Sequence, residues 1–294
     1  QEVDALEDEI ADLEDTVNST RRIRKIIVDE LAEVKKKYAV PRRTEIIYDH
    51  RDEPVMAVEE ELPDYPVHLF FSREGYLKKI TPQSLRMASD QKYKEGDGPY
   101  LQWEASNRDE LLVFTDKQQC YKTRLADFDD TKASALGDYL PSKLSMDPEE
   151  RALWACIPGD YSGHLLFFFE NGKAARVELS AYQTQTRRKK LTGAYSDKSP
   201  LASAFLLRED FEAAVISTEG RCVVFHTASL TPKTTRSTQG VNIMTLKPKY
   251  KVEKVLPLDR THIQNAARYR ARSLPIAGAL LKEEDRGEEQ MTLL

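Results

Sequence analysis

The sequence predicts a mainly β, propeller-like domain of about four blades, preceded by a long coiled-coil-type helix. Three observations support this fold. A strand–turn–strand unit recurs four times, at a spacing of roughly fifty residues, between positions 68 and 227. Apolar residues in the first forty positions follow a heptad pattern instead. The pattern changes at Pro41, and proline is a residue type that ends helices.

Each repeat consists of an apolar run, a turn, and a second run that carries Lys or Arg. The copies are HLFFSREGYLKKI at 68–80, LLVFTDKQQCYKTRL at 111–125, LLFFFENGKAARVEL at 165–179 and AAVISTEGRCVVFHT at 213–227. Asn171 and Gly172 are the strongest hairpin signal, because a type I′ turn needs positive φ at both central positions. One unit cannot bury its apolar face alone, so we expect the repeats to form one domain over residues 67–258.

Residues 1–48 are predicted to form the coiled-coil helix. The helix carries two apolar rows, Val3, Leu6, Ile10, Leu13, Val17 and Ile23, Ile27, Leu31, Val34, Tyr38. The rows are out of register near residues 18–22, which predicts a stutter or bend there. The alternative is one long amphipathic surface helix. Because Gln1 already lies within the helical pattern, we expect the chain to be a piece of a longer polypeptide.

The remaining segments are an acidic, proline-bearing linker at 49–66 and a polar tail at 259–294, which we expect to be partly disordered. Cys120, Cys156 and Cys222 lack metal-site spacing and indicate buried, reduced thiols. No membrane span or leader segment is visible, which favours a cytoplasmic protein.

No set of residues indicates catalysis, a metal site or a cofactor on this chain. There is no phosphate-binding GxxxxGK[ST] loop, and the five histidines are scattered. Asp127, Asp129 and Asp130 lack a neighbouring His or Cys, which is typical of a solvated loop.

Charge is distributed unevenly along the chain, whose net charge is −5. Residues 1–65 carry a net charge of −9, whereas residues 173–254 carry +8. A basic stripe on a rigid β scaffold is typical of proteins that bind the DNA backbone. Ordinary solubilising Lys and Arg are the alternative.

The densest basic run, in AYQTQTRRKKLTGAY at 181–195, is predicted to lie in an exposed loop between blades. Guanidinium groups fit phosphate oxygens, and the neighbouring Gln and Thr add neutral donors. The usual alternative is a solvated charge run. The candidate DNA-binding residues are this run and five flanking bases: Arg187, Arg188, Lys189, Lys190, Lys173, Arg176, Arg221, Lys233 and Arg236.

Three stretches resemble the C-terminal part of the A subunit of bacterial type IIA topoisomerases, DNA gyrase and topoisomerase IV. They are ELAEVKKKYAVPRRTEI at 30–46, EEELPDYPVHLFFSREGYLKKI at 59–80 and the blade recurrence itself. The resemblance implies a β-pinwheel, whose blades exchange strands and bind double-stranded DNA on a basic rim. It also implies a homodimeric, nucleoid-associated enzyme in which the A-subunit cleavage core and the B-subunit ATPase use Mg and ATP.

Two departures from the family bear on activity. The stretch QSLRMASDQKYKEGD at 83–97 lacks the Gln-Arg-Arg-Gly-Gly-Lys-Gly box of gyrase, which favours a topoisomerase IV-like subunit. The string NAARYRARS at 265–273 contains Arg268 and Tyr269, like the family's catalytic tyrosine, but lacks the following Thr-Glu and is interpreted as coincidence. We expect a DNA-bending module without the catalytic tyrosine or the ATPase. The alternative is a propeller-type protein-interaction scaffold on a coiled-coil stalk, with no DNA role.

Overall fold

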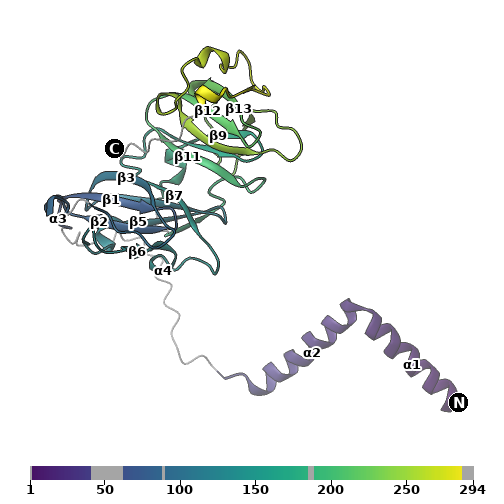
Figure 1. Ribbon diagram of the computed structural model, residues 1–294. Coiled ribbons are helices and arrows are strands. Elements are labelled where there is room, and N and C mark those ends of the chain that lie inside the picture. Colours follow the sequence, from purple (N-terminus) through teal and green to yellow (C-terminus); the bar gives the residue numbers. More distant parts are fainter. Residues whose placement is uncertain (1, 41–61, 88–89, 185–188, 287–294) are drawn as a thin grey trace. The chain divides into compact units, whose positions relative to one another are not determined.

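The computed structural model describes residues 2–40, 62–87, 90–184 and 189–286 (Figure 1). The chain falls into two compact units, residues 1–58 and residues 59–294. Each unit is described by itself below.

The N-terminal unit contains two helices, α1 (Glu2–Asn18) and α2 (Thr20–Tyr38), instead of the single helix predicted over 1–48. They are separated at Ser19, whose side-chain oxygen accepts a hydrogen bond from the Arg22 backbone N–H and so caps α2. The Arg22 guanidinium pairs with Asp12, 2.6 Å away, and with Asp15. The break lies where the two apolar rows change register. Residues 41–48 lie outside the described part.

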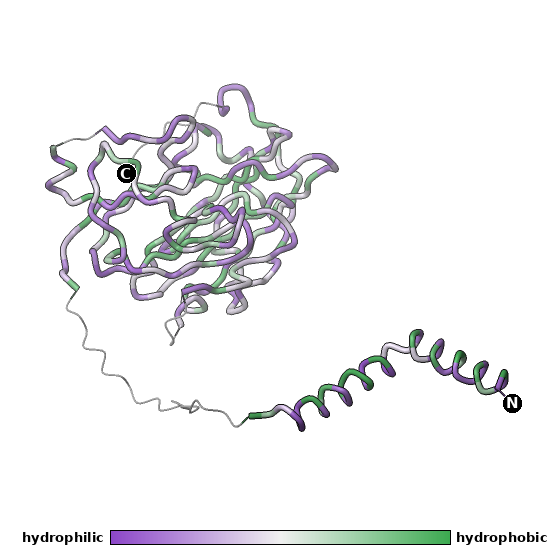
Figure 2. The backbone as a smooth tube through the Cα atoms, turned by 90° about the horizontal axis from the view of Figure 1, so that it is seen from below, coloured by the Kyte–Doolittle hydropathy of each residue, from purple (hydrophilic) through white to green (hydrophobic). Residues whose placement is uncertain are grey.

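Both helices carry an exposed apolar row. Ile10 and Leu13 on α1 are 55% and 57% exposed, and Leu31 on α2 is 60% exposed. Figure 2 shows apolar and polar residues alternating along both helices. Pairing of these rows in a coiled coil stays a prediction.

The second unit consists of four antiparallel sheets of four strands each, which confirms the predicted mainly β fold with four blades. In spatial order, the first sheet contains β3 (Pro99–Ser106), β1 (Pro66–Ser72), β2 (Tyr76–Ile80) and β6 (Asp138–Tyr139). The second contains β10 (Lys190–Thr192), β5 (Gln119–Arg124), β4 (Glu110–Thr115) and β7 (Ala152–Cys156). The third contains β11 (Leu201–Leu207), β8 (His164–Phe169), β9 (Lys173–Glu178) and β14 (Val241–Asn242). The fourth contains β15 (Val252–Pro257), β12 (Glu212–Ser217), β13 (Arg221–His226) and β16 (Ala279–Leu280).

The central hairpin of every sheet closes through a three-residue turn. The last turn residue has positive φ each time, and these residues are Gly75, Gln118, Gly172 and Gly220. The prediction of a two-residue type I′ turn at Asn171 and Gly172 is therefore wrong, because only Gly172 takes the left-handed conformation there. Gln118 fills the same position in the hairpin that lacks glycine.

Short edge strands link neighbouring sheets. Residues 125–139 leave the second sheet's hairpin and supply β6 to the first sheet. Residues 179–192 and 227–242 likewise supply β10 to the second sheet and β14 to the third. We call these stretches the first, second and third crossing segments. Each begins with a 3-10 turn: η1 (Leu125–Asp127), η2 (Leu179–Tyr182) or η3 (Thr227–Ser229).

The tail completes the fourth sheet. Up to residue 286, where the described part ends, no fifth hairpin follows, and residues 258–280 run from η4 (Leu258–Arg260) through η5 (Ala266–Arg268) to β16. We call this stretch the fourth crossing segment; η6 (Glu283–Asp285) follows it. The predicted domain end at 258 therefore falls inside the fourth sheet, because the open edge of β13 is covered by the chain that comes next. Residues 287–294 lie outside the described part.

The core consists of apolar layers between successive sheets. Along β8, Leu165 and Phe167 pack toward the second sheet, whereas Leu166 and Phe168 pack toward the fourth. This burial of both faces explains the continuous apolar runs in the sequence. A third layer joins the first and second sheets. Among the described residues no apolar cluster joins the first sheet to the fourth, so the sheets form an open row.

Both ends of the row are covered by non-repeating chain. Ile216 on the outer face of the fourth sheet packs against Tyr269 and Leu281 from the tail. At the first sheet, α3 (Pro82–Met87) packs on its own sheet, where Leu85 contacts the cluster of Phe70, Ile80 and Ala133. With α4 (Leu140–Lys143), this helix interrupts a domain that the sequence predicts as almost entirely β.

Candidate nucleic-acid interface

Two of the predicted DNA-binding residues are exposed and free of charged partners. Lys189 lies in the second crossing segment, where its backbone carbonyl accepts a hydrogen bond from Lys122 N–H, 2.8 Å away. Lys233 lies in the third crossing segment, beside Val177 of β9. Within the described ranges neither ammonium group has an ion-pair partner. Arg187 and Arg188 lie outside the described residues.

Lys190 anchors the second crossing segment. Its ammonium group lies 2.8 Å from the Asp147 carboxylate and over the Tyr121 ring, 5.5 Å from the centroid. The hydrogen bond to Asp147 raises the pKa of Lys190, and the same hydrogen bond lowers the pKa of Asp147. Tyr121 in turn donates to the buried carboxylate of Glu150, 2.8 Å away. This network holds one end of the basic loop against the second sheet.

Arg176 and Arg221 form ion pairs within the β domain. The Arg176 guanidinium is 11% exposed and pairs with Asp210 at 2.9 Å. Arg221 pairs with Glu219 at 3.0 Å and donates to the Gly278 carbonyl at 2.8 Å. Both guanidinium groups are paired with carboxylates of the fold, so the structure does not offer them as free surface cations.

Arg236 joins the second and third crossing segments. Its guanidinium lies over the Tyr182 ring, 6.0 Å from the centroid, and donates to the Ala181 carbonyl at 3.4 Å. Tyr182 is buried at the start of the second segment, and its hydroxyl donates to Ala194 O at 2.6 Å. On the same edge, Lys173 donates to Gln239 at 3.2 Å. Arg236 therefore ties the third crossing segment to the start of the second.

The crossing segments differ sharply in charge. The first contains Asp127, Asp129 and Asp130 and one base, Lys132, before Gly137. Residues 179–193 contain four bases and no acid, and residues 227–240 contain two bases and no acid. The first crossing segment therefore carries a net negative charge, whereas the second and third carry a net positive charge.

The sequence pattern did not single out the fourth crossing segment. Residues 260–278 contain four arginines and no acidic residue. The sequence signal for this segment is a stretch without acidic residues that ends at Gly278. The third crossing segment has the same pattern, ending at Gly240.

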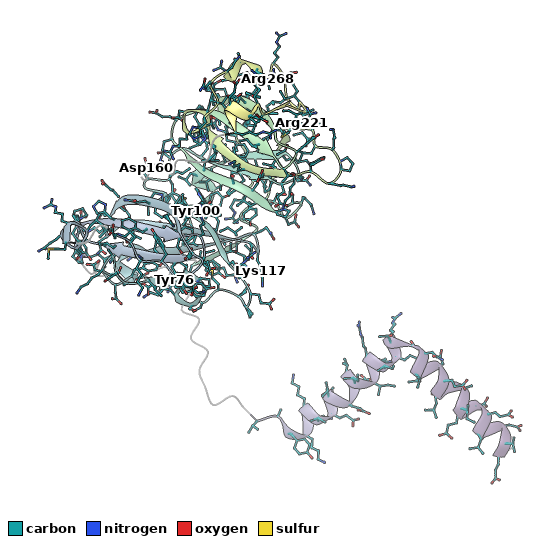
Figure 3. All side chains as sticks on the ribbon, viewed as in Figure 1. Tyr76, Tyr100, Lys117, Asp160, Arg221 and Arg268 are labelled. Carbon is teal, nitrogen blue, oxygen red and sulfur yellow. The ribbon has the colours of Figure 1, made fainter. Side chains whose placement is uncertain are left out.

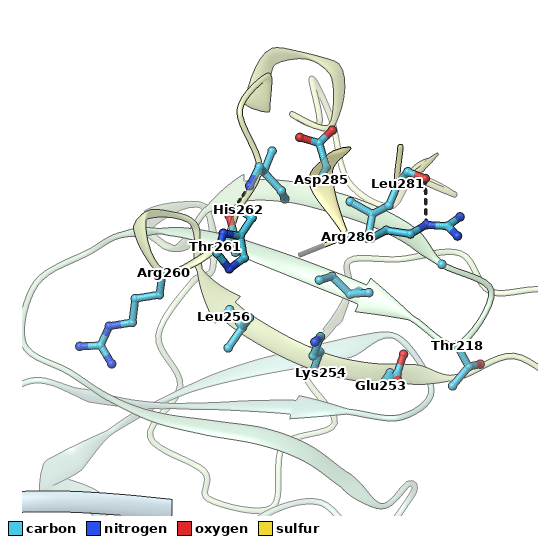
Figure 4. Close-up of a pocket in the computed structure, with 13 residues that line it drawn as sticks. Thr218, Glu253, Lys254, Leu256, Arg260, Thr261, His262, Leu281, Asp285 and Arg286 are labelled. Atoms are coloured by element: carbon cyan, nitrogen blue, oxygen red, sulfur yellow. Dashed lines mark hydrogen bonds between the residues drawn. The ribbon is translucent and has the colours of Figure 1, made fainter. Parts of the chain in front are cut away.

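Other features of the described residues indicate no particular ligand. No group of three or more His, Cys, Asp or Glu side chains among them is arranged to hold a metal ion. A depression of about 250 Å³ lies between β15 and the tail, and Arg260, His262 and Asp285 are among the residues that line it (Figure 4). Cations and carboxylates line it together. Within the described ranges, none of the helices has the length and apolar character needed to span a membrane.

Comparison with known proteins identifies the fold and its relatives. The family model of the DNA gyrase C-terminal domain, a β-propeller, matches residues 109–137, 163–191 and 214–259. The A subunit of DNA topoisomerase 4 from Bacillus subtilis is 29% identical over 196 residues, covering 65% of this chain and 24% of that protein. The A subunit of DNA gyrase from Campylobacter jejuni is 28% identical over 190 residues, covering 60% of this chain and 21% of that protein.

The chain thus spans about a quarter of the length of these relatives or less. Among solved structures, the C-terminal domain of a DNA topoisomerase IV superposes with a TM-score of 0.59 at 23% identity, over 67% of this chain and 62% of that one. The matches confirm the resemblance seen in the sequence: the β domain is similar to the C-terminal β-propeller domains in the A subunits of bacterial DNA gyrase and topoisomerase IV.

Proposed function

We propose that the β domain binds the backbone of double-stranded DNA through its second and third crossing segments. The observation that carries this proposal is the contact of Arg236 with Tyr182 and Ala181, which joins two acid-free basic segments on neighbouring sheets. The packed layer between those sheets keeps the basic groups at fixed separations. Phosphate oxygens are the partners that spaced Lys and Arg side chains bind without regard to base sequence.

The proposed contacts are Lys189, Lys233, Arg236 and Lys173, together with Arg187 and Arg188 from the sequence. Lys190 supports the loop through Asp147 and contributes charge. Arg176 and Arg221 act as positioning residues, because their guanidinium groups are bound to carboxylates of the fold.

DNA that contacts the edges of two neighbouring sheets has to change direction from one edge to the next. The domain would therefore bend the duplex and present it to the strand-passage core of a type IIA topoisomerase. The partners in that role are the A-subunit cleavage core, in a homodimer, and the B-subunit ATPase, which uses Mg and ATP in the cytoplasm.

A topoisomerase IV-like subunit fits better than a supercoiling gyrase. The first crossing segment is acidic, residues 83–97 lack the gyrase box, and α3, which overlaps that stretch, packs on the first sheet. Both features argue against DNA passing continuously around the whole domain.

The salt dependence of DNA binding tests the proposal. Each phosphate contact contributes about 0.9 to the slope of log affinity against log salt concentration. Replacing Lys189 and Lys233 by Ala should therefore lower the slope by about 2 and weaken binding to all sequences alike. The matched control is Lys132→Ala, an exposed lysine at the acidic first crossing segment, which should leave the slope unchanged.

Two outcomes contradict the proposal. A domain that does not bind random-sequence duplex at low salt would favour the protein-interaction scaffold, which the net charge of −5 also permits. If the Lys189→Ala, Lys233→Ala variant folds and keeps the wild-type slope, the DNA must bind another surface of the domain.

A further inference from the structure

The string NAARYRARS at 265–273 lies in the fourth crossing segment. It resembles the context of a catalytic tyrosine, but the phenol of Tyr269 is 3% exposed and donates to Asp285 Oδ2, 2.6 Å away. Burial raises the pKa of Tyr269, and the hydrogen bond to Asp285 raises it further by a smaller amount. A buried, proton-retaining phenol cannot reach a phosphodiester, so the segment needs another explanation.

The fourth crossing segment repeats the geometry of the first and third. Gly137, Gly240 and Gly278 all have positive φ, between 71° and 85°. A Cβ atom on each would lie 2.0–2.6 Å from a carbonyl oxygen of the adjacent hairpin strand. The residue after each glycine then pairs with that strand, as Asp138 with Leu77, Val241 with Ala174 and Ala279 with Cys222.

The match continues upstream of the glycine. Isolated parallel bridges place Asp130 beside Lys79 in the first sheet, Lys233 beside Val177 in the third and Arg270 beside Val224 in the fourth. The Lys233 N–H donates to Arg176 O and the Ala271 N–H donates to Val224 O at the matching strand position, so Ala271 takes the place on the fourth sheet that Lys233, a proposed DNA contact, takes on the third. Arg270 and Arg272 flank that place.

Two anchors hold the segment rigidly. Tyr269 binds Asp285, as described above. Arg270 makes a paired hydrogen bond to the Glu212 carboxylate, with distances of 2.7 and 2.8 Å. This pairing neutralises Arg270 and fixes the backbone on which its neighbours Arg268 and Arg272 stand.

Arg268 and Arg272 are exposed, and within the described ranges neither guanidinium group has a hydrogen-bond or ion-pair partner. Figure 3 shows Arg268 at the end of the β domain opposite to Tyr76 of the first hairpin. The nearest acidic stretch is η6, where Asp285 is bound to Tyr269 and Glu284 to Lys282.

We propose that Arg268 and Arg272 contact DNA phosphates and extend the interface from the second and third sheets onto the fourth. The tail thereby supplies the fourth sheet with both an edge strand and a basic surface. This inference rests on the proposed function, because it names a further contact for the same ligand.

Salt titrations of a random-sequence duplex test the inference. The variant with Arg268→Ala and Arg272→Ala should lower the slope of log affinity against log salt by about 1.8, and its hydroxyl-radical footprint should shorten at one end. Replacing both by Lys should restore most of the slope, because charge and not fork geometry sets this quantity. Arg86→Ala, at an exposed arginine of α3 on the first sheet, is the control and should change neither quantity.

The outcomes separate this inference from the proposed function. If the wild-type domain does not bind duplex DNA, both are overturned. If binding depends on Lys189 and Lys233 while the Arg268→Ala, Arg272→Ala variant keeps slope and footprint, only the tail contact is overturned. Protection of Cys222 from thiol reagents in that variant verifies that the tail is still docked, since Cys222 lies beneath it.

Discussion

Loosening the tail should expose one cysteine of three. Cys120, Cys156 and Cys222 are buried free thiols. Cys222 packs with Tyr269 and Leu281 of the tail, whereas Cys120 and Cys156 lie in the layer between the second and third sheets. The Tyr269→Phe substitution removes the hydroxyl that binds Asp285 and leaves the ring in place.

The size of the effect follows from that hydrogen bond. Burial raises the pKa of Cys222 to about 12, so the folded protein presents a protonated, covered thiol at neutral pH. A hydrogen bond from a buried hydroxyl to a carboxylate contributes about 1.5–3 kcal/mol. If the tail closes faster than the reagent reacts, Tyr269→Phe should raise the reaction rate of Cys222 by about 10- to 150-fold.

The assay is the rate of thiol modification by Ellman's reagent, with the modified residue identified by peptide mass spectrometry. Tyr182→Phe is the matched control, because its hydroxyl binds Ala194 O at 2.6 Å beside Cys120. The Tyr182→Phe variant should accelerate the modification of Cys120 and leave Cys222 protected. The reasoning is refuted if Tyr269→Phe accelerates all three thiols equally, which would indicate global unfolding, or if Cys222 reacts rapidly in the wild type.

Three further predictions concern other parts of the chain. Lys78→Met should cost about 1–3 kcal/mol and expose residues 81–98 to trypsin, because the buried ammonium group donates to three oxygens around that segment. The Arg270 hydrogen bonds hold the pKa of Glu212 below its usual value, so their stabilisation is complete above about pH 4.3 and is lost as pH falls further; amide hydrogen exchange of the tail should rise there. Ile10→Asp should abolish any self-association seen in analytical ultracentrifugation without changing the melting temperature of the β domain, because this side chain is exposed in α1.

The hairpins could be predicted because their signals are local. Each needs only an apolar run, a turn and a second run, and three of the four turns carry glycine at the left-handed position. The break between α1 and α2 was predicted for the same reason, since the change of heptad register lies within a few residues.

The crossing segments could not be predicted, because their edge strands are only two or three residues long. A strand of that length has no periodicity of its own. Its place depends on the open edge of another repeat. The tail is the clearest case. Its polar sequence predicts disorder, and only the uncovered edge of β13 shows where β16 can pair.

The candidate site was predicted only in part, because free and paired cations look alike in a sequence. Arg176 pairs with Asp210, which lies 34 positions away. Lys233 lies in a segment without any acid, and its ammonium group has no ion-pair partner in the part of the chain that the structure describes. Tertiary contacts thus decide which cations remain available for a phosphate.

Photo-crosslinking from single surface cysteines tests the central claim most directly. Because the three native thiols are buried, a new cysteine at Lys233→Cys or Lys132→Cys can be labelled selectively with an azidophenacyl group. The account predicts crosslinks to duplex DNA from position 233 in the third crossing segment and none above background from position 132 in the first. Equal yields at the two positions, or crosslinks from position 132 alone, would contradict it.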